Sequence, residues 1–291
     1  MRICDVMRPL MRVFPRQSIT LLGYLGAGFG NDPQWKTVSP RYRSYFDRDL
    51  QCVVTTDLAE WGGRSCYYWG RFWDVTHQAV LRKFLSPGDT YIDIGANVGF
   101  QSLYAARLVG TSGQVLSFEP SPSTYAVLAG HVAINRIRNC RTFQIALSDA
   151  PGEATLNQLE EHSGTATLRP QSQVLRSVSV SVERGDEVLR DMPFVGKALV
   201  KLDVEGFEQR VLMGLRETLN RIATVSVEVT PEWLAQQGGS AEELYRYMEH
   251  AGFRALIPRL RWRMGLWGAQ LEITPVSQPP VGQHDVVFVR Q

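Results

Sequence analysis

From residue 74 onward, short apolar runs alternate with amphipathic helical segments, and this alternation is the strongest constraint on the fold. The expected helices are 74–85, 100–108, 123–134, 207–219 and 241–250. The expected strands are 90–94, 114–119, 142–147, 197–203, 224–229, 253–258 and 285–290, with an inserted strand at 177–183. Strands separated by helices at this interval predict a parallel sheet with right-handed crossovers.

The last two expected strands break this rule, because only a loop lies between 253–258 and 285–290. Two strands without an intervening helix can pair as an antiparallel hairpin. We therefore expect an α/β fold with a mostly parallel, seven-stranded sheet and an antiparallel hairpin at its C-terminal edge.

Residues 1–73 lack the regular alternation of the rest of the chain, and we expect them to form an N-terminal extension to a main domain of residues 74–291. The extension is rich in arginine, glycine and aromatic residues, and we expect short strands at 52–56 and 65–69. So many aromatic side chains must be buried against something. We expect the extension to cap a substrate cleft or to form a homodimer interface.

Charge and cysteine content favour a small-molecule function. The chain has 31 basic and 29 acidic residues, and this balance indicates neither nucleic-acid nor membrane-surface binding. The four cysteines form no C-x-x-C pair, as is typical of reduced thiols. The longest early apolar stretch, 19–29, is too short to span a bilayer. We expect a soluble cytoplasmic protein.

The segment 91–99 ends a strand in a glycine-bearing turn. Such a turn brings backbone N–H groups close to a ligand at the carboxyl edge of the sheet. Asn97 stands where the dinucleotide motif has its middle glycine, so only Gly95 and Gly99 remain, and the turn suits a ligand without a pyrophosphate. Asp93 is a carboxylate inside an otherwise apolar strand, and it can order the turn or meet an ammonium group across a water.

Two further groups of acidic residues lie at expected strand ends. Glu119 ends the second strand, where a carboxylate accepts hydrogen bonds from both hydroxyls of an adenosine ribose. Lys201, Asp203 and Glu205 alternate around the fourth strand, which should place them on one side. Glu228 repeats this feature on the next strand. Charges there face a cleft or pair with one another.

Together these motifs resemble the FkbM family of methyltransferases over residues 75–291. The resemblance is carried by Asp93–Gly99, by the Phe118-Glu119-Pro120 corner and by the residues between Ala146 and Asp149. It is also carried by the segment from Val200 to Glu208, which reads K-x-D-x-E-G-x-E. The segment 162–168 is similar to the Ser-Gly loop of that family, with His162 where Asn is more usual.

This resemblance implies a Rossmann-like class I methyltransferase fold with S-adenosylmethionine as cofactor. It implies methyl transfer to a hydroxyl of a small molecule, such as a polyketide or a sugar. The residues that it implies at the amino-acid end of the cofactor are Asp93, Gly95, Ala96, Asn97 and Gly99. Glu119 and Pro120 are implied at the ribose, and Ala146 and Leu147 at the adenine.

Methyl transfer to an alcohol benefits from a base, which contributes about 10²–10⁴-fold in rate. We expect Asp203 to be the base, Lys201 to keep it ionised or to orient the acceptor, and His162 to be the second candidate base. Asp203 and Glu228 do not make a metal signature, so no metal site is expected. Two alternatives remain: an NAD-dependent oxidoreductase, and a non-catalytic scaffold that binds S-adenosylmethionine.

Overall fold

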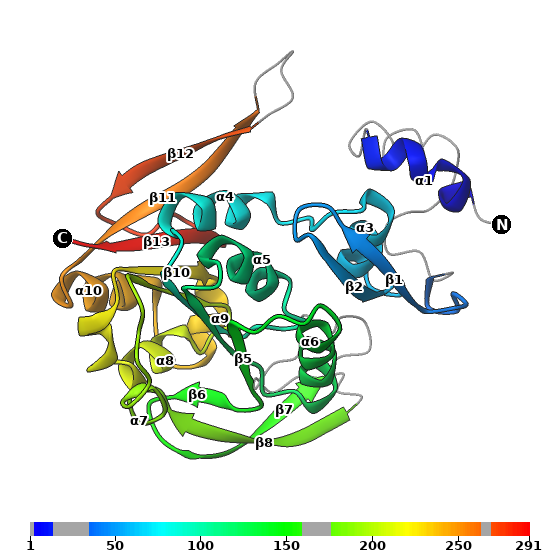
Figure 1. Cartoon of the computed structure of the whole chain (residues 1–291). Coiled ribbons are helices and arrows are strands. Elements are labelled where there is room, and N and C mark those ends of the chain that lie inside the picture. The colour runs from blue at the N-terminus through cyan, green and yellow to red at the C-terminus, as the bar shows by residue number, and fades with distance from the viewer. Residues whose placement is uncertain (1–2, 14–34, 159–175, 263–268) are drawn as a thin grey trace.

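The computed structural model describes residues 3–13, 35–158, 176–262 and 269–291 (Figure 1). The helices are α1 (Ile3–Val13), α3 (Trp61–Trp69), α4 (Val75–Phe84), α5 (Phe100–Val109), α6 (Pro122–Ile134), α7 (Gly185–Leu189), α8 (Glu208–Gly214), α9 (Pro231–Gln236) and α10 (Ala241–His250), with a 3-10 helix, η3, at Thr218–Arg221. The strands are β1 (Tyr42–Asp47), β2 (Cys52–Asp57), β3 (Thr90–Ile94), β4 (Gln114–Phe118), β5 (Cys140–Phe143), β6 (Ala146–Ser148), β7 (Gly152–Gln158), β8 (Arg176–Arg184), β9 (Ala198–Leu202), β10 (Thr224–Val229), β11 (Phe253–Trp262), β12 (Ala269–Val276) and β13 (His284–Arg290). Among these helices none combines the length and apolarity needed to cross a membrane.

The large sheet has the strand order β12-β11-β13-β10-β9-β3-β4-β5. β10, β9, β3, β4 and β5 run parallel, whereas β13 and β11 pair antiparallel to each other and β13 pairs antiparallel to β10. This arrangement confirms the Rossmann-like α/β class and the antiparallel pairing of the last two predicted strands. The parallel centre brings the carboxyl ends of β3, β4, β9 and β10 to one edge, where ligands bind in open α/β sheets.

The predicted count of seven strands is wrong, because the large sheet has eight. The additional strand, β12, pairs with β11 inside the region expected to be a loop. Its apolar residues alternate with polar ones, and Leu271 and Ile273 pack against the buried Val80, Leu256 and Val287. The hairpin of β11 and β12 projects from the body of the molecule (Figure 1).

The predicted strand 142–147 is also divided between two sheets. β5 ends at Phe143, and β6 leaves the large sheet to pair with β8 in a three-stranded sheet with β7. The predicted inserted strand 177–183 is confirmed as β8. Ala146 and Leu147 therefore lie beside the end of β4 but do not belong to the strand pair that β5 forms with β4.

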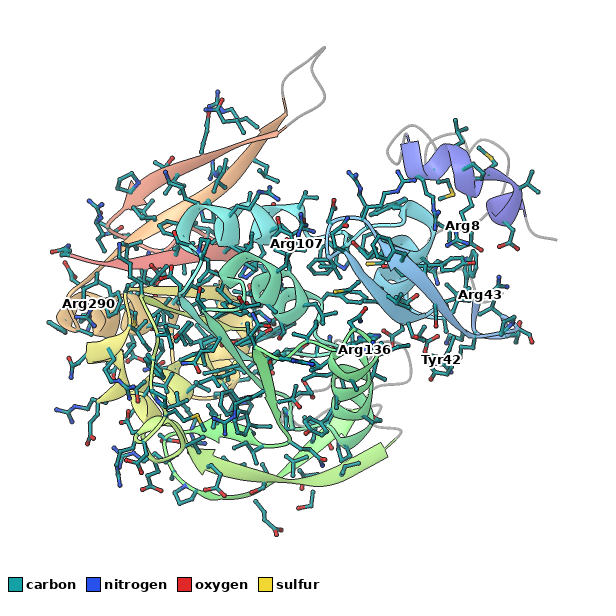
Figure 2. All side chains as sticks on the ribbon, in the orientation of Figure 1. Arg8, Tyr42, Arg43, Arg107, Arg136 and Arg290 are labelled. Atoms are coloured by element: carbon teal, nitrogen blue, oxygen red, sulfur yellow. The ribbon has the colours of Figure 1, made fainter. Side chains whose placement is uncertain are left out.

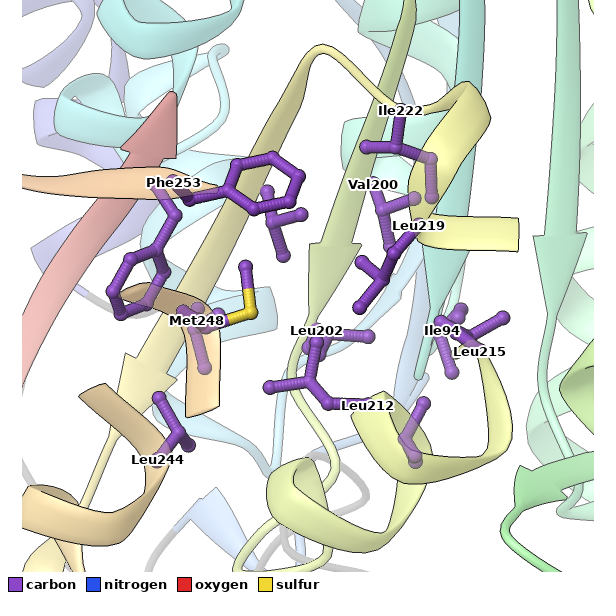
Figure 3. Packing of buried hydrophobic residues seen from close by; sticks show 14 of the residues in the cluster. Ile94, Val200, Leu202, Leu212, Leu215, Leu219, Ile222, Leu244, Met248 and Phe253 are labelled. Carbon is purple, nitrogen blue, oxygen red and sulfur yellow. The ribbon is translucent and has the colours of Figure 1, made fainter. Parts of the chain in front are cut away.

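The strands at the sheet centre are buried on both faces by residues that alternate along the chain. In β9, Val200 and Leu202 pack with Leu212 of α8 and with Leu215, the residue after α8, on one face (Figure 3). Leu199 packs with the N-terminal region and α5 on the other face. Because side chains alternate in a strand, Lys201 lies on the same face as Leu199. A charge therefore faces the side that the N-terminal region covers.

The N-terminal region contains a β1–β2 hairpin, and a helix where a strand was predicted. β2 confirms the predicted strand at 52–56, but residues 65–69 belong to helix α3, which ends at Gly70 in the left-handed conformation. α3 buries Cys66, Tyr67 and Tyr68 among α1 and the hairpin. Burial on several sides thus overrides the β-propensity of this aromatic run.

The same region is joined to the main domain through a continuous apolar core. Trp35, Val54 and Phe72 belong to one cluster with Phe100 and Leu103 of α5. The core therefore extends across the boundary at residue 74.

Side chains of α6 and of its C-cap residue, Asn135, extend this junction by hydrogen bonding to the edge of β2. The amide of Asn135 accepts from Val53 N at 2.7 Å and donates to Val53 O at 2.8 Å. Thr55 N donates to Nε2 of His131 at 2.8 Å. The N-terminal hairpin is thus held on α6 as well as on the apolar core.

Candidate active site

Polar side chains occupy one face of four adjacent strands at the centre of the large sheet. Asp93 of β3 is opposite Lys201 of β9, and Lys201 is opposite Ser226 of β10. On the next pair, Glu228 of β10 lies opposite Asp285 of β13. Most apolar residues of these strands, such as Ile92, Val200 and Val227, alternate with the polar ones and pack on the other face. A row of charges on a covered sheet face indicates a functional site rather than core packing.

Lys201 contacts three neighbouring groups at this site. Its Nζ lies 3.1 Å from Oδ2 of Asp203 and 3.5 Å from Oδ1 of Asp93, and it donates to the carbonyl of Gly95 at 3.1 Å. Burial alone would lower the pKa of Lys201, but the carboxylates of Asp203 and Asp93 outweigh burial and raise it. Lys201 is therefore a fixed positive charge between the strand end and the glycine turn.

Asp93, which forms an ion pair with Lys201, is fully buried. Its Oδ2 accepts from the hydroxyl of Ser102 at 2.5 Å, and Ser102 accepts from Ser117 at 2.8 Å. Burial raises the pKa of Asp93, and Lys201 opposes that rise. Asp93 is therefore linked to the turn through Lys201, which also donates to the carbonyl of Gly95.

The turn after β3 follows the ends of the neighbouring strands closely. The N–H groups of Gly95 and Ala96 both donate to the carbonyl of Phe118, at 3.0 Å. Gly95 has φ +80°, and a Cβ atom there would lie 1.9 Å from the carbonyl oxygen of Asp203. Only glycine fits at this position, so the turn can approach both β4 and β9.

Glu119 connects the same turn to the end of β4. Its two oxygens accept from Asn97 N and Ser121 N, each at 2.9 Å. Burial raises the pKa of Glu119 to about 7, although the two N–H groups oppose that rise. A carboxylate held in this way keeps lone pairs on both oxygens for a ligand that brings two hydroxyl donors.

Glu119 lines a cavity of about 270 Å³, which we call the cofactor cleft. Its walls include Gly95, Asn97, Pro120, Ala146 and Leu147, which were predicted from the sequence to bind the cofactor. Asp93 lies behind the turn. Ala96 and Gly99 line the neighbouring cavity instead.

Glu205 also lines the cofactor cleft and does not lie on the side of Lys201. The prediction that Lys201, Asp203 and Glu205 share one side is therefore wrong. β9 ends at Leu202, and Glu205 has φ +51°, so the alternation of an extended strand does not continue to it.

A larger cavity of about 580 Å³ lies against the polar row, and we call it the acceptor cavity. The sheet and the glycine turn form one side, with Lys201, Glu228 and Asp285 among the lining residues. The N-terminal region forms another side, through Trp61, Trp73 and residues of the β1–β2 hairpin such as Tyr42, which is labelled in Figure 2. Asn97 and Asp203 line both cavities, so the two cavities meet at the carboxyl end of β9.

Asp74, His77 and Asp285 are among the titratable residues of the acceptor cavity that were not singled out from the sequence. Asp74 caps α4 by accepting from His77 N at 2.9 Å, and it also accepts from Gln101 at 3.2 Å. Burial lowers the pKa of His77 to about 3, which leaves it neutral. Asp285 begins β13. Asp74 could have been found as a helix-capping residue. The sequence holds no signal that the antiparallel register places Asp285 opposite Glu228.

The other predicted catalytic residue, His162, lies outside the described residues. In the described ranges, no group of three or more His, Cys, Asp or Glu side chains is arranged to hold a metal ion.

Comparison with known proteins places these features in one family. Residues 93–255 match the family described as "Methyltransferase FkbM domain". The methyltransferase sdnD of Sordaria araneosa is 29% identical over 208 residues, 60% of this chain and 78% of the relative. The 31-O-demethyl-FK506 methyltransferase FkbM of Streptomyces tacrolimicus is 28% identical over 175 residues, 50% of this chain and 66% of the relative. The hexuronic acid methyltransferase AglP of Haloferax volcanii is 28% identical over 159 residues, 52% of this chain and 62% of the relative.

Proposed function

The chain belongs to the FkbM family of methyltransferases, and on that premise we propose that it methylates a hydroxyl of a small molecule. The cofactor is S-adenosylmethionine, bound in the cofactor cleft, and the alcohol binds in the acceptor cavity. The observation that carries the proposal is that these two cavities meet at Asn97 and Asp203. A donor and an acceptor in adjoining cavities would be aligned for direct transfer, and alignment alone contributes about 7–11 kcal/mol.

The residues of the cofactor cleft fit this cofactor. Glu119 would accept hydrogen bonds from the two ribose hydroxyls, because it lines the cleft and each of its oxygens, which accepts one N–H, has a further lone pair. The Gly95 turn would hold the amino-acid end, and Ala146 and Leu147 would contact the adenine. When bound, the cofactor supplies an electrophilic methyl group on a sulfonium.

Asp203 is the proposed base for the hydroxyl proton of the acceptor. It follows β9 directly, and its side chain keeps 37% exposure at the junction of the two cavities. Lys201 would orient the side chain of Asp203, because the ammonium lies 3.1 Å from the carboxylate and is itself held by Asp93 and Gly95. Glu228 is a second carboxylate on the same face, and burial raises its pKa to about 7.

The N-terminal region is the proposed cap of the acceptor cavity. Trp61 and Trp73 would exclude water from the reacting hydroxyl, since they line the cavity opposite the sheet. The alternative role of this region as a homodimer interface remains a proposal without a supporting contact.

The same turn is less suited to an NAD-dependent oxidoreductase than to a methyltransferase. Asn97 replaces the middle glycine of the dinucleotide motif, and its side chain accepts from Val98 N at 2.7 Å. That N–H is therefore engaged within the loop and cannot bind a pyrophosphate. A non-catalytic scaffold would leave the pair of the buried Lys201 and the partly exposed Asp203 without a use.

Titration calorimetry on the full chain tests the cofactor. S-adenosylhomocysteine should bind in the micromolar range, roughly −7 to −8 kcal/mol, and NAD should not bind. Tight binding of NAD without binding of S-adenosylhomocysteine would refute the proposal. Mass spectrometry of hydroxylated acceptors incubated with the enzyme and S-adenosylmethionine tests the transfer itself.

A further inference from the structure

Carboxylates outnumber basic groups in the acceptor cavity. Six Asp and Glu side chains line it, against Arg41 and Lys201. Arg41 is already engaged by a fork of hydrogen bonds to Asp57, at 2.8 and 2.7 Å. Lys201 is shared between Asp203 and the buried Asp93. The basic groups of the cavity are therefore already neutralised by carboxylates.

Asp74, Glu228 and Asp285 form no direct ion pair within the described part of the chain, and the cation that acts on their charges at longer range is Lys201, which Asp203 and Asp93 already pair. Asp74 accepts only from neutral N–H groups, and Glu228 accepts from the amide of Gln283. Glu228 and Asp285 lie directly opposite each other in an antiparallel pair. Like charges in that position destabilise a sheet unless something compensates them. Burial, followed by the carboxylates of Asp203 and Asp285, raises the pKa of Glu228 to about 7, and burial, followed by the carboxylates of Asp74 and Asp203, raises that of Asp285 to about 6.

The acceptor cavity also has an aromatic part. Trp61 and Trp73 are 37% and 45% exposed, and their ring centroids lie 5.8 Å apart in an edge-to-face arrangement. Both line the acceptor cavity. Tryptophan faces attract ammonium groups more strongly than other rings do. A cation in this cavity would thus be attracted both by carboxylates and by tryptophan rings.

We propose that the methyl acceptor carries a protonated amine near its reactive hydroxyl, and that Asp74, Glu228 and Asp285 bind this ammonium in the cavity that the Trp61–Trp73 pair also lines. This inference rests on the proposed function, because it names the class of acceptor for the same site. Three carboxylates without a direct ion pair, in a cavity with more acidic than basic side chains, attract an amino alcohol, accept a neutral diol less well and repel a hydroxy acid. The three acidic side chains do not converge as metal ligands in the described ranges, and an ammonium requires no such convergence.

A matched series of three small alcohols tests the inference on the full chain. The compounds are trans-2-aminocyclohexanol, trans-1,2-cyclohexanediol and trans-2-hydroxycyclohexanecarboxylate, which differ only in the group beside the hydroxyl. Binding is measured at neutral pH by quenching of tryptophan fluorescence, with S-adenosylhomocysteine already bound. The amino alcohol should bind about tenfold more tightly than the diol, equivalent to about 1.4 kcal/mol, and the carboxylate should bind most weakly.

Two single variants locate the effect. Asp285→Asn and Glu228→Gln should each weaken binding of the amino alcohol severalfold while leaving the affinity for the diol unchanged. Glu187→Gln, which removes one charge from an exposed position on α7, should leave both affinities as in the wild type. The comparison of the three ligands on the unmodified protein stands even if a variant fails to fold.

Each outcome decides the inference. Equal binding of amine and diol, no binding of the amine, or tighter binding of the carboxylate would overturn it. Binding of S-adenosylhomocysteine is measured first, in the absence of any acceptor. Failure of that binding refutes the proposed function, whereas its success without a preference for the amine refutes only the acceptor class.

Discussion

Replacing Asp203 with Asn should separate a catalytic role of this residue from a structural one. Asn keeps the size of the side chain but loses the charge and the capacity to take a proton. The cost in stability should be small, because Asp203 keeps 37% side-chain exposure and Lys201 retains Asp93 at 3.5 Å and the carbonyl of Gly95 at 3.1 Å. A partly exposed ion pair contributes about 1 kcal/mol at most, which corresponds to a melting shift of roughly 2–4 °C.

The expected loss in rate is much larger. If Asp203 takes the hydroxyl proton, the rate of methyl transfer should fall about 10²–10⁴-fold, and affinity for S-adenosylhomocysteine should stay close to that of the wild type. Single-turnover measurements give the rate, and thermal unfolding gives the stability. A higher pH should partly restore the rate of the variant, because hydroxide can replace the missing base.

Asp93→Asn is the matched control. Asp93 is fully buried and pairs with the same lysine, so its loss should lower stability by about 3 kcal/mol or more. The reasoning is refuted if Asp203→Asn retains the wild-type rate, or if its melting temperature falls as far as that of Asp93→Asn.

Three other results are expected. Glu119→Ala should weaken binding of S-adenosylhomocysteine by about 1–3 kcal/mol in calorimetry, because two ribose hydroxyls lose a charged acceptor; an unchanged affinity would exclude the ribose role. Asn135→Ala should raise KM for the acceptor without changing cofactor affinity, since the amide holds β2 at Val53; equal KM values in wild type and variant would count against the cap. Burial raises the pKa of Glu208 from 4.5 to about 7, so the folded protein binds more protons in this window and its stability falls as pH rises through it. Glu208→Gln should therefore gain stability relative to the wild type between about pH 4.5 and 7 in thermal unfolding, and a constant difference would show that Glu208 does not titrate there.

Local patterns in the sequence were sufficient for the strand–helix alternation, the glycine turn and the family. Each depends on residues that are neighbours in the chain: Gly95 must be glycine where the chain turns from β3 toward α5, and Glu119 follows β4 directly. The same locality explains the errors. The aromatic residues 65–69 have high β-propensity, yet burial among α1 and the hairpin places them in α3. β12 was missed although its apolar and polar residues alternate.

Only the tertiary structure brought the acceptor cavity together. Asp74 comes from the cap of α4, Glu228 from β10 and Asp285 from β13, and no spacing in the chain relates them. The position of Asp285 depends on the antiparallel register of β13, since a slip of one residue would turn its side chain to the other face. Glu205 was placed wrongly for a local reason. It lies beyond the end of β9 and has a left-handed backbone conformation, so the alternation of the strand does not apply to it and it lines the cofactor cleft. Side-chain direction within a strand follows from the sequence, but which strands meet and in what register depends on packing between distant segments.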